Sequence, residues 1–187
     1  MLGFYFRVAA ALWALWLISW QFAALWRSKP TVRAPRGTYR AQFIVVVLGF
    51  FLVFNGIPRL AQPVLWPVGD VLGWSMVGVI IAGILFAWWA RIHLGKLWSG
   101  GIERMAEHRV VDSGPYAVVR HPIYTGLIAA AFATAAIRAT PWALLGAALF
   151  SLGFALKARV EERFLENELG GYEAYRGRVR MIVPFLL

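Results

Sequence analysis

The chain has 187 residues, of which 60% are hydrophobic and only 15% are charged, with ten tryptophans and no cysteine. Soluble domains carry about 25% charged and about 45–50% apolar residues, so this composition excludes a water-soluble globule and a disordered chain. The lack of cysteine excludes disulfides, thiolate metal sites and a cysteine nucleophile. A formal net charge of +10 could indicate nucleic acid, but in so apolar a chain basic residues more often face the cytoplasmic leaflet. The composition therefore predicts a small membrane protein with several spans and no nucleic-acid partner.

Five segments are long and apolar enough to cross a bilayer, which takes roughly 17–25 residues per helix. The first has no charge in its apolar run and no small-residue cleavage site after it, so we interpret it as a retained span rather than a signal peptide. A short turn at residues 138–141 separates the last two segments, which predicts a tight helical hairpin. The predicted spans cover about residues 8–26, 41–57, 71–90, 122–137 and 140–156.

Basic residues gather on one side of these spans. Sixteen of the nineteen lysines and arginines lie between spans one and two, between spans three and four, or after span five. Arg7, Arg59 and Arg138 lie on the other side. The positive-inside rule then predicts a multi-pass protein of the cell or inner membrane, with its amino terminus outside and its carboxyl terminus in the cytoplasm.

The chemistry-bearing residues lie in the two predicted cytoplasmic segments, residues 91–126 and 157–184. These segments contain all three histidines and every acid except Asp70. Arg120 and His121 stand directly before Pro122, which suits the first turn of a helix. The helix amino terminus and Arg120 together predict a site that favours an anionic ligand group. The chain has no histidine pair at i, i+4 spacing, no G-x-G-x-x-G and no Walker motif, so we expect neither a metal site nor a soluble nucleotide-binding fold.

Structural roles are the alternative for several of these residues. His93 fits an interfacial polar residue, and for His108 neither role is favoured. Lys157 and Arg159 are each followed by an acid three or four residues later, a spacing that fits a solvated helix with ion pairs. For His121, held between an arginine and a proline at a helix entrance, a functional role is favoured.

Two sequence elements stand on either side of the predicted hairpin. The first, residues 114–126, reads G-P-Y-x-x-x-R-H-P-x-Y-x-G. The second begins with Glu161-Glu162 and continues through Tyr172-x-x-Tyr175 to Pro184. Upstream, residues 94–99 read L-G-x-x-W-S. This combination resembles the isoprenylcysteine carboxyl methyltransferase family and the wider phospholipid methyltransferase group, over about half of the chain.

Because the chain has no internal repeat and no low-complexity linker, we expect a single domain, residues 1–187. The resemblance implies a small, all-α integral membrane fold, in agreement with the five predicted transmembrane helices. The cytoplasmic loop and carboxyl-terminal segment would close a pocket for S-adenosylmethionine. Lys157, with Arg159 nearby, falls where the family has a basic residue associated with the substrate, and Glu103 stands where some relatives have Gln. The predicted cofactor-binding residues are His108, Arg109, Val110, Val111, Tyr116, Arg120, His121, Pro122, Ile123, Tyr124, Glu161 and Glu162.

The residue types suit this cofactor. Glu161 could accept hydrogen bonds from its ribose diol or ammonium, while His121 and Arg120 could meet its carboxylate. Tyr116 and Tyr124 offer aromatic faces for a cation–π contact with the sulfonium. A carboxylate acceptor would need no general base, whereas an amine would have to lose a proton.

The expected acceptor is lipophilic, either an isoprenylcysteine-type carboxylate or a lipid head group, with a thiol or another small lipophile left open. Membrane lipids are the other expected partner. Two alternatives remain for the function. Membrane sterol and enone reductases carry a similar G-P-Y and R-H-P-x-Y run and bind NADPH, but they are usually larger. A non-enzymatic scaffold with lipid-binding basic loops would explain the charge but not the cluster of His121, Tyr124, Glu161 and Glu162.

Overall fold

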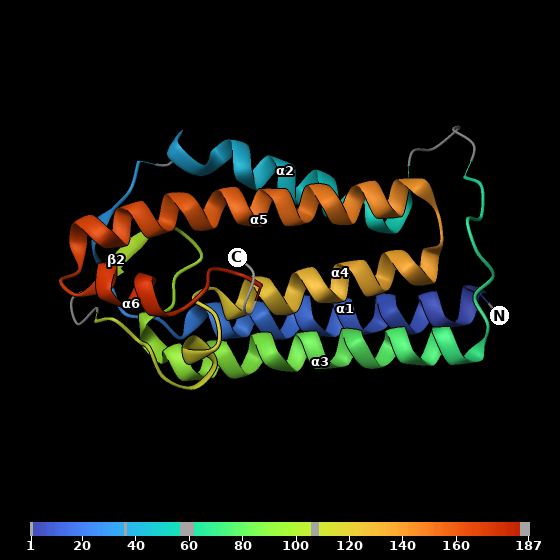
Figure 1. Cartoon of the computed structure of the whole chain (residues 1–187), viewed down its shortest axis with the longest axis horizontal. Helices are drawn as coiled ribbons and strands as arrows, with labels where there is room; N and C mark the ends of the chain where they lie inside the picture. The colour runs from blue at the N-terminus through green and yellow to red at the C-terminus, as the bar shows by residue number, and fades with distance from the viewer. Residues whose placement is uncertain (1, 36, 57–61, 106–108, 184–187) are drawn as a thin grey trace.

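The computed structural model describes residues 2–35, 37–56, 62–105 and 109–183, which are mostly helical (Figure 1). Three positions named above, Arg59, His108 and Pro184, lie outside these ranges. Two short 3-10 turns cover Gly95–Leu97 and Gly114–Ala117. The helices are α1 (Leu2–Leu25), α2 (Gly37–Asn55), α3 (Asp70–Leu94), α4 (Pro122–Arg138), α5 (Pro141–Glu168) and α6 (Tyr172–Arg178).

Three of the helices are long and apolar enough to cross a membrane, over Gly3–Leu25, Asp70–Leu97 and Pro141–Glu168. They contain the first, third and fifth predicted spans, which supports an integral membrane protein. Shorter apolar helices, Arg40–Asn55 and Pro122–Arg138, occupy the second and fourth predicted spans. Helix α5 extends well beyond the predicted end of the fifth span, so that its last turns carry the two adjacent glutamates out of the apolar part of the bundle.

The predicted hairpin between α4 and α5 is confirmed. Helix α4 ends at Arg138, and Ala139 adopts the left-handed conformation (φ 51°) that turns the chain. The Thr140 hydroxyl then caps α5 by accepting a hydrogen bond from the backbone N–H of Ala143, at 3.3 Å. Pro141 occupies the first turn of α5, where a missing N–H carries no penalty.

Glycines allow two pairs of helices to pack backbone to backbone. Helix α2 packs along α5, and α3 packs along α4, while the α4–α5 contact joins the pairs and α1 lies against α3 and α4. A Cβ atom at Gly83 or at Gly126 would overlap the other glycine's carbonyl oxygen. Gly49 and Gly146 have the same relation between α2 and α5. Close approach through small residues is a common way for helices to associate in membranes, where lipid provides no hydrophobic drive between them.

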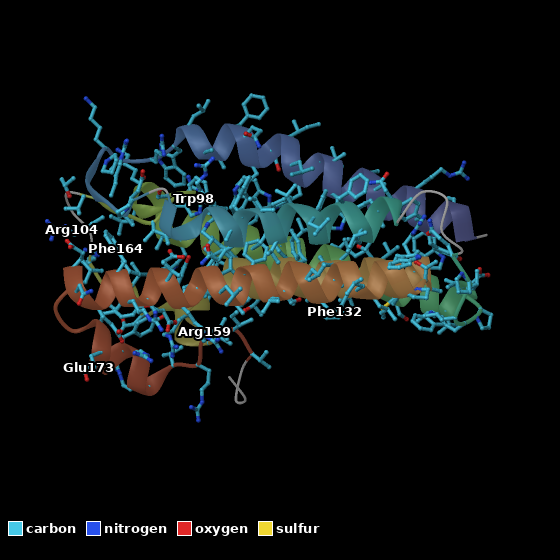
Figure 2. All side chains as sticks on the ribbon, turned by 90° about the horizontal axis from the view of Figure 1, so that it is seen from above. Trp98, Arg104, Phe132, Arg159, Phe164 and Glu173 are labelled. Carbon is cyan, nitrogen blue, oxygen red and sulfur yellow. The ribbon has the colours of Figure 1, made fainter. Side chains whose placement is uncertain are left out.

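One end of the bundle holds most of the irregular structure, and we call it the loop end. Helices α1, α3 and α5 finish there, α2 and α4 begin there, and the described N-terminal residues lie at the opposite end (Figure 1). Arg104, Phe164 and Glu173 lie at the loop end, and Phe132 lies far along the bundle from it (Figure 2). The loop end therefore gathers the two segments in which the sequence concentrates its histidines and acids.

A two-stranded antiparallel sheet at the loop end departs from the predicted all-α fold. Strand β1 (Pro30–Arg33) pairs with β2 (Glu103–Met105), with Val32 opposite Arg104 and Arg33 opposite Glu103. The strands have four and three residues, too few to show the alternation that marks a strand in a sequence. Their pairing is decided by tertiary structure, which brings the loop after α1 beside the loop after α3.

Candidate functional site

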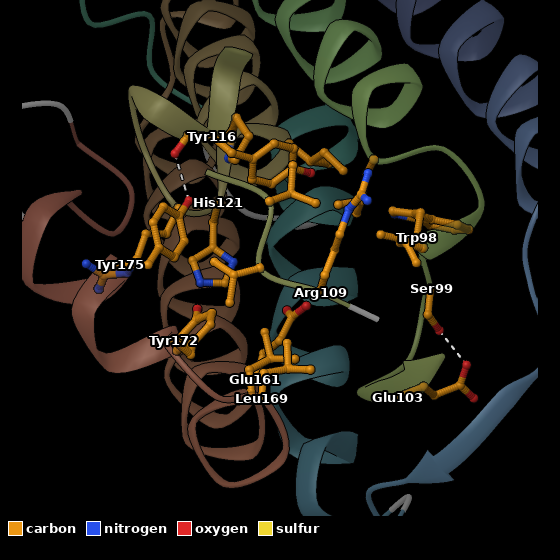
Figure 3. Close-up of a pocket in the computed structure, with 18 of the residues that line it drawn as sticks. Trp98, Ser99, Glu103, Arg109, Tyr116, His121, Glu161, Leu169, Tyr172 and Tyr175 are labelled. Atoms are coloured by element: carbon orange, nitrogen blue, oxygen red, sulfur yellow. Dashed lines mark hydrogen bonds between the residues drawn. The ribbon is translucent and has the colours of Figure 1, made fainter. Parts of the chain in front are cut away.

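A pocket opens at the loop end between the amino-terminal end of α4, the last turns of α5 and the surrounding loops (Figure 3). Its empty space, including the part open to solvent, is about 790 Å³. The lining comes from the end of α3 and its following loop, from Arg109–Val111, from the entrance of α4, and from α5 and α6. Segments far apart in the sequence thus share one cavity.

Most of the predicted cofactor-binding residues line this pocket. His108 is outside the described residues, and Glu162 lies behind the pocket wall at 4% exposure. Of the two predicted substrate-positioning residues, Lys157 lies beside Tyr124, which is part of the pocket lining. Arg159 is exposed on α5 (Figure 2). The predicted residues in the lining are Arg109, Val110, Val111, Tyr116, Arg120, His121, Pro122, Ile123, Tyr124 and Glu161.

Glu162 is the centre of a buried ionic network. Its carboxylate accepts two hydrogen bonds from Arg120, from Nε at 2.7 Å and from Nη2 at 3.0 Å, and lies 3.1 Å from Nε2 of His121. The side chains of Arg120 and Glu162 are only 8% and 6% exposed. The third guanidinium nitrogen of Arg120 donates to the carbonyls of Arg176 and Val179. All three guanidinium nitrogens of Arg120 are therefore hydrogen-bonded to protein groups, and the residue also lines the pocket.

The same region ties the carboxyl-terminal segment to the entrance of α4. Backbone and side-chain hydrogen bonds make this connection, so that Tyr172 and Tyr175 of α6 form part of the pocket wall. Burial raises the pKa of Tyr116, Tyr172 and Tyr175 above the ordinary value, so their hydroxyls stay protonated well into the alkaline range. The bonds run from Arg120 N to Arg180 O (2.8 Å), His121 N to Met181 O (3.0 Å), Thr125 Oγ1 to Ile182 O (2.6 Å) and Tyr175 Oη to Tyr116 O (2.7 Å).

Glu161, the neighbour of Glu162, has a different environment and points into the pocket (Figure 3). One of its oxygens accepts a hydrogen bond of 2.8 Å from the hydroxyl of Tyr124. Within the described parts of the chain, no side chain bonds to its other oxygen. The ring of Tyr124 is fixed by stacking on His121, with centroids 5.2 Å apart, and on Phe154, at 4.6 Å. Glu161 is thus held by one rigid partner and keeps acceptor capacity toward the pocket.

Two basic residues lie in or beside the same pocket. The side chain of Arg109 extends from the Glu161 side of the pocket toward Trp98 (Figure 3). It has no acidic partner among the residues that the structure describes. The ammonium of Lys157 donates to the carbonyl of Gly100 at 3.0 Å and lies 5.5 Å from the ring centroid of Tyr124. The ion pairs that the sequence allowed along α5, from Lys157 and Arg159 to the glutamates, are not formed in the described structure.

Glu103 also lines the pocket, but its charge is largely taken up by protein groups. It accepts a hydrogen bond of 2.6 Å from the Ser99 hydroxyl and lies 3.2 Å from Nε of Arg33, with Arg27 at 3.9 Å. Within the described ranges, no group of three His, Asp or Glu side chains is arranged to hold a metal ion. Glu103 therefore connects the wall of the pocket to the β1–β2 sheet.

Several lining residues were not assigned to a pocket from the sequence. Trp98 and Ser99 belong to the L-G-x-x-W-S string and Tyr172 and Tyr175 to the second motif, so their membership in these motifs was the available signal. Trp98 is held by the fully buried Arg91, whose guanidinium carbon lies 4.6 Å from its ring centroid. Leu165, which belongs to the second motif, and Leu169, which had no distinguishing pattern, complete the apolar part of the wall.

Part of the sequence that forms this site matches a known protein family. Residues 76–167 match the family model described as the Isoprenylcysteine carboxyl methyltransferase (ICMT) family. The chain belongs to this family. The matched part runs from within α3 through α4 to the last turns of α5, so this member of the ICMT family has both the R-H-P-x-Y-x-G element and the two glutamates inside the match.

Two curated relatives from Bradyrhizobium diazoefficiens are similar to this ICMT-family chain. "Methanethiol S-methyltransferase 2" is 29% identical over 179 residues, and "Methanethiol S-methyltransferase 1" is 27% identical over 176 residues. Each alignment covers 88% of this chain but only 65% and 60% of the two relatives, respectively. The chain therefore spans less than two thirds of the length of these relatives.

Proposed function

We propose that the protein is an integral membrane methyltransferase that uses S-adenosylmethionine to methylate a lipophilic acceptor. The observation that carries this proposal is the pocket at the loop end. It combines aromatic faces with the guanidinium of Arg109, which has no acidic partner among the described residues, and with the carboxylate of Glu161, one oxygen of which bonds to no described side chain. Most of this pocket lies within the part of the chain that matches the ICMT family. Residues 1–187 would act as a single domain.

The charged groups of the pocket fit the amino-acid end of S-adenosylmethionine. Arg109 would bind the carboxylate through its planar fork of donors, and Glu161 would accept from the ammonium or ribose hydroxyls through the oxygen that Tyr124 leaves free. Tyr116 and Tyr124 would face the sulfonium or adenine. When bound, the cofactor supplies a methyl group that is already activated by the sulfonium. The residues of the chain would therefore contribute alignment, which can supply roughly 7–11 kcal/mol.

Lys157 favours an acceptor that carries negative charge. Its ammonium has one described protein partner, the Gly100 carbonyl, which leaves donors for a ligand beside Tyr124. An isoprenylcysteine-type carboxylate and a thiolate both satisfy this condition, and the relatives named for methanethiol support the thiol. A cation also lowers the pKa of a nearby thiol and so favours its nucleophilic thiolate form. We therefore propose that Lys157 orients an anionic acceptor toward the methyl group.

Replacing Lys157 with Gln should reduce methyl transfer about ten- to a hundredfold, because a hydrogen bond to a charged group contributes roughly 1.5–3 kcal/mol. The affinity for S-adenosylmethionine should stay unchanged. Arg159→Gln is the matched control, since Arg159 is exposed on α5, whereas Lys157 lies beside Tyr124 of the pocket lining. Steady-state kinetics together with calorimetric titration of the cofactor measure both effects. Equal turnover by the two variants would show that Lys157 does not hold the acceptor.

The proposed activity is tested by titrating the purified, reconstituted protein with S-adenosylmethionine and, separately, with NADPH. We expect binding of the first and not of the second. Methyl-labelled S-adenosylmethionine should then transfer its label when methanethiol, an isoprenylcysteine analogue or a membrane lipid extract is added, and mass analysis of the products identifies the acceptor. Binding of NADPH alone would instead favour the reductase alternative.

For the topology, we propose five spans with the amino terminus outside and the carboxyl terminus in the cytoplasm. In support, successive helices alternate in direction, and the described N-terminal residues lie opposite the loop end (Figure 1). Reporter fusions after Arg36 and after Leu187 should both give cytoplasmic signals, because sixteen of nineteen basic residues lie on that side. A periplasmic signal at either position would contradict this topology.

A further inference from the structure

A second cavity adjoins the pocket on the side of α3. It is lined by the loop after α1, the end of α3 and residues 109–113, and it shares Arg109–Val111 with the pocket as a common wall. Its empty space, including the part open to solvent, is about 1080 Å³. In contrast to the aromatic pocket, most of its lining side chains are polar: Ser28, His93, Lys96, Arg109, Asp112 and Ser113.

The polar groups of this second cavity favour an anion. Lys96 has no acidic partner in the described part of the chain, while the carboxylate of Asp112 is already paired with Arg178 at 3.1 Å. His93 and Ser113 are linked through Nε2 and Oγ at 3.0 Å, and Ser28 adds a second hydroxyl. The Lys96 ammonium, the Ser28 hydroxyl and the donor that the linked His93–Ser113 pair keeps free suit a phosphate group. The pairing of Asp112 leaves no free acid in the described lining to attract a choline or ethanolamine group.

An apolar stripe on α3 leads to the second cavity. Leu85, Trp89 and Ile92, spaced by three to four residues, are 62%, 50% and 60% exposed and therefore lie on one outer face of the helix. On a helix long enough to cross a membrane, such a face contacts acyl chains. The stripe ends at His93 and Lys96, where the polar cavity begins. The cavity thus lies where the head group of a lipid on this stripe would be.

We propose that the second cavity binds the phosphate of an anionic phospholipid, whose acyl chains lie along the exposed stripe of α3. Lys96 supplies the charge, and Ser28 and the remaining donor of the His93–Ser113 pair supply additional hydrogen bonds. Arg109 belongs to the proposed cofactor site, so it acts here only as part of the common wall. Because this wall also lines the pocket, a bound head group would restrain one side of the site proposed for the cofactor.

Lipid competition on the full chain tests this proposal without cofactor or turnover, so its result is independent of the proposed activity. The protein is mixed with equal amounts of phosphatidylglycerol and phosphatidylcholine, and native mass spectrometry measures which lipid is retained. Wild type should retain phosphatidylglycerol preferentially. Lys96→Gln should lower this preference about fivefold, as expected for ~1 kcal/mol per basic residue near an anionic surface. Lys96→Arg, which keeps the charge, should largely restore the preference.

Arg163→Gln is the matched control, because Arg163 is an exposed base on α5 that does not line the second cavity. It removes the same charge and should leave the preference for phosphatidylglycerol unchanged. An equal loss in both variants would overturn the proposal in favour of non-specific attraction, as would an unchanged preference in Lys96→Gln. Millimolar inorganic phosphate is added to wild type in a further arm. If it abolishes retention of phosphatidylglycerol, the cavity takes the free ion and the lipid assignment is wrong.

Discussion

Glu162→Gln should loosen the whole loop end, whereas the same change at the adjacent Glu161 should leave the fold intact. Glu162 neutralises a guanidinium that is 8% exposed and also contacts His121. Removing one partner of a buried ion pair typically costs about 3–5 kcal/mol, because the remaining charge stays buried without compensation. Arg120 also holds the carbonyls of Arg176 and Val179, so the carboxyl-terminal segment should loosen with it.

Thermal unfolding and hydrogen exchange measure this difference between the two glutamates. Glu162→Gln should lower the melting temperature and speed exchange in residues 172–183. Glu161→Gln should melt like wild type but bind S-adenosylmethionine about ten- to a hundredfold more weakly, the range for losing a charge-assisted contact of roughly 1.5–3 kcal/mol. Wild-type stability of Glu162→Gln would contradict the buried network, and wild-type cofactor affinity of Glu161→Gln would contradict the pocket assignment.

Gly126→Ala should separate α3 from α4 and destabilise the bundle by about 1–3 kcal/mol, the usual cost of overpacking. A Cβ atom at this position would overlap the carbonyl oxygen of Gly83, and neither backbone can move without shifting its helix. Denaturant titration in detergent measures the change in the free energy of unfolding.

Gly78→Ala, in α3, provides the control for Gly126→Ala. A Cβ atom there has nothing within 4 Å, and alanine is favoured over glycine inside a helix by roughly 0.5–1 kcal/mol. This variant should therefore be as stable as wild type or slightly more stable. Similar behaviour of the two variants would mean that the α3–α4 contact does not depend on close backbone approach. The expected contrast gives the glycine of the R-H-P-x-Y-x-G element a packing role.

The sequence could not predict the different environments of Glu161 and Glu162. Both were predicted to bind the cofactor, because both belong to one motif. Successive residues of a helix point about 100° apart, so Glu161 reaches the pocket while Glu162 turns toward Arg120 and His121. Two such steps, about 200°, separate Lys157, beside Tyr124, from the exposed Arg159. Residue type and spacing identified the cluster, and only its packing distinguished the roles of its members.

The helices followed from the sequence because their cause is local. An apolar segment in lipid must satisfy its own backbone hydrogen bonds, and a helix does so within the segment. Composition and the turn before Pro141 were therefore sufficient to predict the five apolar helices, α1 to α5, and the hairpin, but not α6. The R-H-P-x-Y-x-G element and the paired glutamates likewise indicated the family, because motif spacing is a property of the chain alone.

Tertiary structure decided the features that depend on partners distant in the chain. The β1–β2 pairing joins segments about seventy residues apart. The commitment of Arg120 to Glu162 and to the carboxyl-terminal segment also depends on such contacts. So does the position of Arg109, which has no acidic partner in the described structure. Whether a charge is neutralised or available depends on which side chains the fold brings within about 4 Å, and that proximity is set by helix packing rather than by sequence neighbours.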